Sequence, residues 1–382
     1  MRRGFFMYIR QKQLEKFPLY LIPGKVLVLY GARRTGKTTM LREFLKNVSE
    51  PYLSVTGEDI TVRDFLSSHS IDKIKTFVGE QRLLVIDEAQ VIPDIGQNLK
   101  LIVDHIPDVR VIATGSSAFD LARGIGEPLT GRKHTLCLFP LAQMEIGSIE
   151  NRAQTAANLE SRLIYGSYPE VVLFTDNHKS EQYLKELISA YLYKDILTLD
   201  GVRYSAKIGK LLQLIAFQIG REVSFSELGL HLGMNKGTVE RYLDLLEKAF
   251  VIIRLGGFSR NLRKEIIKNS RFYFVDTGVR NALINNFNPL SIRDDAGLLW
   301  ENYLVVERLK KQEYQEMFSA NYFWRTYSKQ EIDWIEERGG NLHGYEFKWG
   351  KARTRPPNEW KNAYPHATWQ VINRDNYLEF IL

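Results

Sequence analysis

The amino-acid sequence predicts an α/β protein in three parts, and three observations support this prediction. The chain has 382 residues, more than the roughly 250–300 at which a single hydrophobic core stops growing. Its N-terminal third alternates aliphatic, strand-like runs with helical patterns, as in a parallel sheet covered by helices. Its middle shows long helical periodicity, and its last third returns to short strand-like runs. We therefore expect a parallel-sheet domain at residues 1–158, a helical connector at 159–265 and a small α/β domain at 266–382.

The composition is that of a folded protein from a reducing compartment. Hydrophobic residues make up 44% of the chain and charged residues 25%, which is enough apolar material for several cores. The one cysteine, Cys137, excludes an internal disulfide and lies in an apolar run, where we expect it to be buried. The first ten residues are too polar for a signal peptide, and no run reaches membrane-spanning length. These features predict a cytoplasmic protein with no membrane partner, and the net charge of +7 leaves the partner's chemistry open.

The first candidate site follows the strand-like residues 26–30. Residues 31–38 have the spacing G-x-x-x-x-G-K-[ST], and a helical pattern begins directly after them. Such glycines let the backbone fold around phosphate oxygens, so that N–H groups and a helix N-terminus face negative charge. Lys37 would reach the β- and γ-phosphates of ATP, and Thr38 would bind Mg²⁺. The predicted nucleotide-binding residues here are Gly31, Ala32, Arg33, Arg34, Thr35, Gly36, Lys37, Thr38 and Thr39.

A second aliphatic run, residues 83–86, ends in two adjacent carboxylates, Asp87 and Glu88. The run has the composition of a buried parallel strand, which would place both side chains at the carboxyl edge of the sheet, where ligands bind. We expect Asp87 to hold Mg²⁺ and Glu88 to polarise the attacking water as a general base. The pair therefore predicts hydrolysis of the nucleotide as well as its binding.

Two more residues near this sheet each have two open interpretations. Ser116 follows the strand-like residues 109–113, where a hydroxyl group would sense the γ-phosphate, but Ser and Gly clusters also form plain turns. Arg132 precedes the strand-like residues 135–139 and is a candidate catalytic arginine finger or sensor, because a fixed guanidinium stabilises charge on a transferred phosphoryl group. A solvated surface arginine is the competing interpretation of Arg132.

Together these motifs resemble the prokaryotic AAA-type ATPases that carry a C-terminal domain of unknown function 4143. The resemblance implies an ATP- and Mg²⁺-dependent enzyme whose biological role is unsettled. Because AAA-type sites are often completed by an arginine of a neighbouring subunit, it also suggests a homo-oligomer, with Arg132 acting in cis or in trans. The likeness covers nearly the whole chain and rests on residues 29–39, 85–90, 114–117, 131–132, 139–141, 165–171, 193–197 and 274–278.

The middle of the chain contains a helix-turn-helix pattern at residues 223–249, and the strand-like residues 251–257 resemble the wing of a winged helix. The outward face of the second helix carries carboxylates as well as basic residues, and carboxylates meet phosphates unfavourably. Contact with nucleic acid and a structural or protein-binding role therefore both stay open. A basic run that would clamp a phosphate backbone or form a solvated surface follows, with Phe258 and Tyr273 nearby: Arg254, Arg260, Arg263, Lys264, Lys268 and Arg271.

In the last third, Asp333 followed by Glu346-Phe347-Lys348 resembles the PD-(D/E)xK nuclease core. Strand alternation puts Glu346 and Lys348 on one face, and a hairpin turn at residues 339–341 would bring Asp333 beside them. Asp333 and Glu346 would then bind a second metal ion, with Glu301 adding a ligand and Lys348 orienting water. The alternative is an alternation of charges that arises by chance on an exposed strand.

Three functions are consistent with these patterns. The first is an ATP-driven protein that couples nucleotide state to the winged helix and the nuclease-like domain and acts on DNA or RNA. The second is a nucleotide-dependent regulatory switch that binds protein partners and keeps the nuclease-like fold in an inactive form. The third is an Mg²⁺-dependent nuclease gated by ATP.

Overall fold

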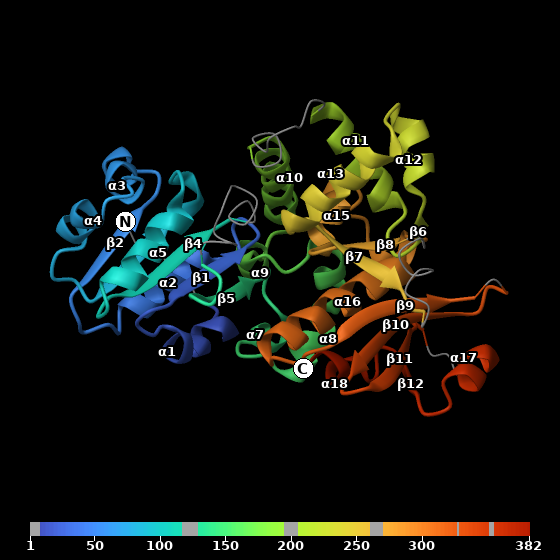
Figure 1. The fold of residues 1–382 in the computed structure, drawn as a ribbon. Helices are drawn as coiled ribbons and strands as arrows, with labels where there is room; N and C mark the ends of the chain where they lie inside the picture. Colours follow the sequence, from blue (N-terminus) through green and yellow to red (C-terminus); the bar gives the residue numbers. More distant parts are fainter. Residues whose placement is uncertain (1–7, 117–128, 195–204, 260–269, 327, 351–354) are drawn as a thin grey trace. The chain divides into compact units, whose positions relative to one another are not determined.

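The computed structural model describes residues 8–116, 129–194, 205–259, 270–326, 328–350 and 355–382, which form two compact units (Figure 1). The described residues up to Leu141, with residues 194 and 248–250, make up the N-terminal unit. The other described residues from Ala142 onward make up the C-terminal unit. The first unit therefore ends before residue 158, where the sequence predicted the boundary.

The N-terminal unit is built on a five-stranded sheet in which every pairing is parallel. The strand order is β2-β3-β4-β1-β5, so that β4 separates β1 from β3. The predicted parallel α/β sheet is thus confirmed, and the aliphatic runs lie in the buried strands β1, β3 and β4, as expected for strands covered on both faces. The strands are β1 (Val26–Gly31), β2 (Tyr52–Thr56), β3 (Leu83–Asp87), β4 (Arg110–Gly115) and β5 (Lys133–Leu138).

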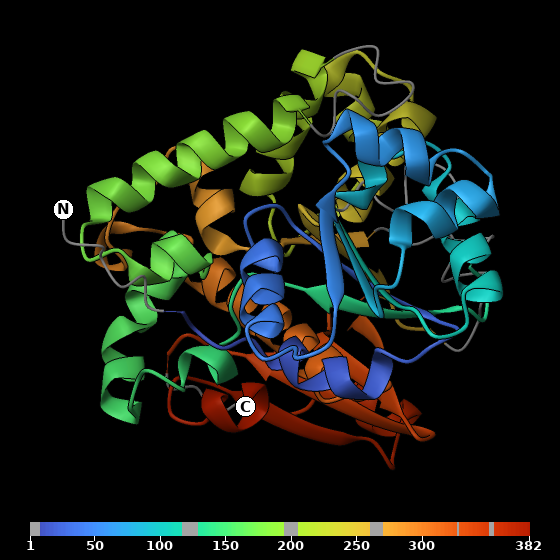
Figure 2. The same ribbon diagram turned by 90° about the vertical axis from the view of Figure 1, so that its left-hand side faces the viewer.

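Helices cover both faces of this sheet (Figure 2). Apolar residues of α3, α4 and α5 pack on one face, and those of α1 and α2 pack on the other. Because the faces are covered, the edge at the carboxyl ends of the strands is the place where a ligand can reach the strand residues. The helices are η1 (Lys12–Lys16), α1 (Phe17–Tyr20), α2 (Lys37–Leu45), α3 (Ile60–Leu66), α4 (Ile71–Val78), η2 (Ala89–Val91) and α5 (Ile95–His105).

The C-terminal unit contains a seven-stranded mixed sheet with the order β12-β11-β10-β9-β7-β8-β6. Strand β7 pairs with β8 in antiparallel fashion and with β9 in parallel fashion. The predicted boundary at residues 265/266 is corrected by this pairing, because the strands on its two sides share one sheet. The strands are β6 (Glu222–Val223), β7 (Ile252–Gly257), β8 (Ser270–Phe274), β9 (Ala320–Arg325), β10 (Glu331–Arg338), β11 (Asn341–Phe347) and β12 (Thr368–Ile372).

Helix α16 (Ala296–Tyr314) is the central helix of the C-terminal unit and is buried on most sides. Its apolar residues share one core with residues of α8, α10, the sheet and α18. The remaining helices pack around this core and along the sheet. They are α7 (Gln143–Ile146), α8 (Arg152–Tyr165), α9 (Pro169–Leu173), α10 (Asn177–Lys194), α11 (Ser205–Phe217), α12 (Phe225–Leu232), α13 (Lys236–Lys248), α15 (Thr277–Leu283), η3 (Leu290–Ile292), α17 (Asn358–Ala363) and α18 (Tyr377–Ile381).

Two sequence motifs that carried the family resemblance, at residues 165–171 and 274–278, contact each other. Asp276 accepts hydrogen bonds from the backbone N–H of Ser167 (2.7 Å) and of Val279 (3.1 Å), so it fastens the turn after α8 and caps α15. A methyl group at Gly278 would clash with the backbone carbonyl of Tyr165. These motifs therefore have a structural role, which is to hold α15 against the end of α8.

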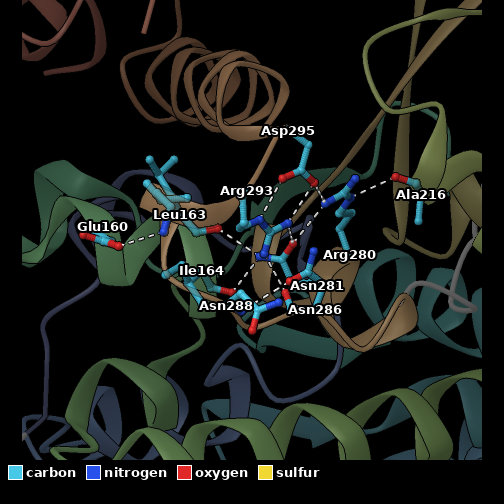
Figure 3. Close-up of polar contacts among 11 residues, drawn as sticks. Glu160, Leu163, Ile164, Ala216, Arg280, Asn281, Asn286, Asn288, Arg293 and Asp295 are labelled. Atoms are coloured by element: carbon cyan, nitrogen blue, oxygen red, sulfur yellow. Dashed lines mark hydrogen bonds and ion pairs between the residues drawn. The ribbon is translucent and has the colours of Figure 1, made fainter. Parts of the chain in front are cut away.

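A buried polar network extends this junction (Figure 3). Asn281 donates to the carbonyl oxygens of Leu163 and Ile164, at 3.1 and 2.8 Å, and accepts from Arg293. Asp295 in turn pairs with both Arg280 and Arg293. Burial opposes ionisation of Asp295, but these two guanidinium groups outweigh it and lower the pKa of the carboxyl group to about 2. The network fixes α15 to α8 and to the segment before α16.

Gly278→Ala should destabilise the C-terminal unit, because the added methyl group meets a backbone atom that cannot rotate away. We expect a loss of roughly 1–3 kcal/mol, the usual range for overpacking, measured by thermal or denaturant unfolding. Gly297→Ala is the matched control, since Gly297 is also the second residue of a helix but has open space around it. Equal stability of the two variants would contradict the proposed close contact at Gly278.

Candidate active site

The loop between β1 and α2 has the backbone that the glycine spacing predicts. Gly31 (φ 148°) and Gly36 (φ 98°) both adopt positive φ values that favour glycine. A methyl group at Gly31 would also clash with the carbonyl of Leu138, because β1 and β5 lie side by side at this point. Helix α2 starts at Lys37, directly after Gly36, so its N-terminus faces the loop. The loop can therefore receive an anion on backbone N–H groups.

Lys37 is only 6% exposed, and its ammonium group is enclosed by this loop. It donates hydrogen bonds to the carbonyl oxygens of Gly31 and Ala32, both at 2.9 Å. Burial lowers the pKa of Lys37 to about 8, although the nearby charges of Glu88 and Asp87 oppose the change. An incoming phosphate would give this buried cation a charged partner.

Asp87 is the last residue of β3, and its carboxylate joins two other residues of the site. Its carboxylate accepts a hydrogen bond from the hydroxyl of Thr38, at 2.8 Å, and a second from the hydroxyl of Thr114 on β4. The Thr114 hydroxyl also accepts from the backbone N–H of Glu88, at 3.2 Å. A hydroxyl and a carboxylate in contact at the end of a phosphate loop are the oxygen ligands that Mg²⁺ takes beside nucleotide phosphates. The residues present therefore fit a Mg²⁺–nucleotide complex.

Glu88 follows in a left-handed conformation (φ 52°). The amide of Gln90 donates to the Glu88 carboxylate at 2.5 Å and to the hydroxyl of Ser116 at 3.3 Å. The predicted residues Glu88 and Ser116 thus lie in one short network at the ends of β3 and β4. Gln90 was not predicted as a site residue, although it lies within the motif at residues 85–90 that carried the family resemblance.

A second unpredicted contribution comes from the segment before η1. Gln11 is buried and donates to the carbonyl of Thr35 at 2.9 Å, while a methyl group at Gly36 would lie 3.1 Å from its side-chain oxygen. Gln13 is also buried and donates to the carbonyl of Cys137 on β5. Cys137 is buried, as expected. This segment supports the phosphate loop from outside, and no spacing in the sequence marks it.

Arg132 is not brought to the phosphate loop of its own chain. It precedes β5, and its carbonyl accepts from the N–H of Val26, at the amino edge of the sheet. The six-residue strand β1 separates this edge from Gly31 by about 16 Å, because a strand advances about 3.3 Å per residue. Its side chain is 41% exposed and pairs with Asp104 at 2.6 Å. The strand direction thus places Arg132 on the opposite edge from its own phosphate loop, and the roles left open for it that remain are action in trans and a solvated surface arginine.

The predicted second metal site also needs correction. Continuing the β10–β11 register past its last pair, Trp334↔Tyr345, puts Asp333 opposite Glu346, as the hairpin predicted. However, the buried guanidinium of Arg271 lies 3.7 Å from Asp333 and 3.6 Å from Glu301. In the described part of the chain, no group of three or more His, Cys, Asp or Glu side chains is arranged to hold a metal ion. An arginine accompanies these carboxylates where we expected a cation from solution.

This cluster contains carboxyl groups that ionise with difficulty. Burial, followed by the charge of Asp333, raises the pKa of Glu301 to about 8, although Arg271 opposes the change. Burial and Asp333 likewise raise the pKa of Glu346 to about 7, although Lys348 donates to it at 2.6 Å. The cluster thus holds protons near neutral pH.

Fewer residues of the basic run near the predicted wing are available to contact a phosphate backbone than the sequence indicated. Arg271 is buried among carboxylates, and Phe258 and Tyr273 are core residues. Arg254 is exposed but donates to the hydroxyl of Ser270 at 2.8 Å. The remaining members of the run, Arg260, Arg263, Lys264 and Lys268, lie outside the described residues.

The fold and the phosphate loop define the class: the N-terminal unit is an AAA-type P-loop domain. The family model of an AAA domain matches residues 23–147. Models for two domains of unknown function, 8612 and 4143, match residues 156–290 and 296–376. The AAA-type and domain-4143 parts of the predicted resemblance are therefore confirmed.

Relatives extend this assignment to most of the chain. An uncharacterized protein of Mycobacterium tuberculosis and one of Mycobacterium bovis are each 30% identical over 339 residues, covering 87% of this chain and 71% of theirs. An uncharacterized protein of Methanocaldococcus jannaschii is 23% identical over 334 residues, covering 82% of this chain and 73% of its own. The chain belongs to the same family as the mycobacterial proteins, and its own residues 23–147 match the AAA-domain model.

Among solved structures, the Walker-type ATPase of Pyrococcus abyssi is similar, with a TM-score of 0.50 and 17% identity. The match covers 74% of this chain and 97% of that one, and at this identity it supports the fold alone. Within the described residues, no helix is both long and apolar enough to cross a membrane.

Nucleotide binding should take up a proton above pH 8, because the pKa of Lys37 is about 8 in the free protein and phosphate charge raises it. At pH 9 we expect roughly 0.9 proton per nucleotide from this group, measured by calorimetry in buffers of different ionisation heat. Lys37→Arg keeps the charge at all these pH values and should bind without this uptake. Identical proton uptake by the wild type and Lys37→Arg would contradict the assignment.

The raised pKa of Glu301 makes the stability of the folded chain depend on pH. Burial raises the pKa of this carboxyl group from 4.5 to about 8 in the folded chain. Its contribution to stability is therefore complete below about pH 4.5 and is lost as pH rises from there through about 8. The melting temperature of the wild type should therefore fall over this window relative to that of Glu301→Gln. Glu337→Gln, at an exposed position of β10, is the control and should follow the wild type. Parallel pH profiles for the wild type and Glu301→Gln would rule the linkage out.

Proposed function

We propose that this chain binds and hydrolyses ATP at the carboxyl edge of the sheet in the N-terminal unit. The observation that carries the proposal is the Asp87 carboxylate, which accepts from the hydroxyls of Thr38 and Thr114 while Glu88 follows it in the chain. Membership in an AAA-type family supports the same activity.

Each residue of the site has a distinct part in this reaction. The loop N–H groups and Lys37 hold and orient the β- and γ-phosphates. Thr38 and Asp87 would hold Mg²⁺, which would supply positive charge to stabilise the transferred phosphoryl group. Thr114 keeps the Asp87 carboxylate turned toward Thr38. This arrangement acts by positioning and charge, which are the main needs of phosphoryl transfer.

Glu88 is the general base that we propose for the attacking water. Its hydrogen bond from Gln90 sets the direction of its carboxylate, and Gln90 is in turn held by Ser116. Ser116 is therefore placed to respond to the γ-phosphate and to alter the position of Glu88. Arg132 can serve only a neighbouring subunit in a homo-oligomer, because of its distance from its own phosphate loop.

For the C-terminal unit we propose a winged helix formed by α11, β6, α12, α13, β7 and β8. The order of these elements and the antiparallel pairing of β8 with both β6 and β7 support it. Helix α13 starts after Asn235, whose side chain accepts from the N–H of Thr238 at 2.7 Å. ATP state would set the arrangement of this winged helix, with DNA or RNA as the first candidate partner.

A second candidate is a nucleotide-dependent switch that binds protein partners. It is favoured by the exposed carboxylates Glu240 and Asp244 on α13, and by the burial of Arg271, which removes one cation from the basic run. In this version the part of the chain from α16 to β12 keeps a PD-(D/E)xK-like fold without cleavage. Support for that fold is the order α16, β9, β10, β11, α17, β12 and the predicted pairing of Asp333 with Glu346.

Steady-state ATPase assays test both candidates. Wild type should turn over ATP, and Glu88→Gln should slow turnover by roughly 10²-fold or more while still binding nucleotide, because the base is lost and the loop is intact. Stimulation of wild type by duplex or single-stranded DNA that fades with salt would support the nucleic-acid partner. Turnover indifferent to DNA would support the protein switch. No loss of rate in Glu88→Gln would exclude the catalytic assignment.

A further inference from the structure

The carboxylate cluster in the C-terminal unit has four acidic side chains drawn from one helix and two strands. Glu301 lies on α16, Glu331 and Asp333 on β10, and Glu346 on β11. Glu331 is exposed, but the other three are largely buried, and the charge of such carboxylates is balanced by protonation, by bound cations or by internal positive charge. The chemistry of the cluster therefore depends on where its positive charge comes from.

The cluster draws positive charge from Arg271 on β8, whose side chain is 6% exposed. Its guanidinium lies 3.0 Å from Glu331, 3.6 Å from Glu301 and 3.7 Å from Asp333. It also stacks over the ring of Phe323, 4.6 Å from the ring centre, which fixes the plane of the group. Strand pairing on both sides of β8 holds its backbone. Arg271 is thus a fixed cation within reach of three carboxylates.

Oxygens that would bind a metal ion are already engaged with protein donors. The Tyr273 hydroxyl donates to Glu301 at 2.7 Å, and the N–H of Phe347 donates to Asp333 at 2.9 Å. Lys348 donates to Glu346. A divalent ion such as Mg²⁺ or Mn²⁺ takes about six oxygen ligands at roughly 2.0–2.2 Å and would also be repelled by Arg271. Each of these three carboxylates therefore already has a hydrogen-bond donor from the protein.

We propose that Arg271 takes the place of a divalent cation in this cluster, so that the native chain closes a nuclease-like carboxylate site with its own side chain. The C-terminal unit then has no metal-dependent cleavage, and the cluster instead ties β8 to α16 and β10. The proposal is independent of ATP hydrolysis in the N-terminal unit, because it concerns other residues and needs no nucleotide.

Binding of Mn²⁺ to the full-length, nucleotide-free protein tests this, with electron paramagnetic resonance reporting free Mn²⁺ and melting temperature reporting stability. The wild type and Asp333→Asn should bind Mn²⁺ equally, because the cluster of the wild type holds no metal ion. Arg271→Gln removes the charge and should bind one Mn²⁺ about tenfold or more tightly than wild type, and Mn²⁺ should raise its melting temperature. Arg271→Lys keeps the charge and is the matched control, which should resemble wild type. The gain should disappear in the Arg271→Gln, Asp333→Asn double variant.

Two outcomes overturn the proposal. One is saturable Mn²⁺ binding to wild type that is lost in Asp333→Asn, which would make the cluster a metal site beside an arginine. The other is a folded Arg271→Gln variant that binds no more Mn²⁺ than wild type. If Arg271→Gln unfolds without Mn²⁺ and folds with it, the proposal is supported. If it stays unfolded in both conditions, Mn²⁺ binding of the wild type is compared with that of Asp333→Asn. Weaker binding by Asp333→Asn overturns the proposal, and equal binding supports it.

Discussion

The carboxylate of Asp87 is the contact on which the nucleotide site depends. It joins the start of α2, through Thr38, to the end of β4, through Thr114. This is possible because β4 lies between β1 and β3, so that the Thr114 hydroxyl stands between the phosphate loop and the Asp87 strand. Parallel strands end at one edge, and the helices on both faces leave that edge for a ligand. Strand order and the position of one hydroxyl therefore determine where Mg²⁺ and phosphate can bind.

The C-terminal unit depends on a different arrangement, in which the buried amide and charged side chains of a central helix have defined partners. Asn302 of α16 bonds both the N–H and the carbonyl of Phe274, and Arg308 makes a two-point ion pair with Glu336. Such contacts let a helix with charged residues lie inside a core, because these buried amide and charged groups are hydrogen-bonded or ion-paired. They also fix the sheet against the helix, which positions Glu301 beside Arg271.

Local spacing was sufficient to predict the phosphate loop, the strand ending in Asp87 and Glu88, and the parallel sheet. The position of Arg132, which the prediction left open, could have been inferred from the sequence, because a residue that precedes a parallel strand must lie at the amino edge. Gln11 and Arg271 could not be predicted in the same way. Gln11 contacts Thr35, which lies 24 residues further along the chain. Arg271 contacts Glu301 on α16 and Glu331 on β10. Only the folded chain brings these residues together.

The two acidic sites of this chain show why a pattern of carboxylates does not by itself identify a metal site. The Asp87 carboxylate accepts from two neutral hydroxyls, which can turn toward a metal ion or exchange with its water ligands. The buried ammonium of Lys37 is also near, but it donates to the carbonyls of Gly31 and Ala32. Around Asp333 a neighbour is a guanidinium, which carries permanent charge and cannot be deprotonated in a protein. The two sites therefore differ in whether a buried cation is paired with the carboxylates themselves, as Arg271 is and Lys37 is not. Sequence motifs do not record this pairing.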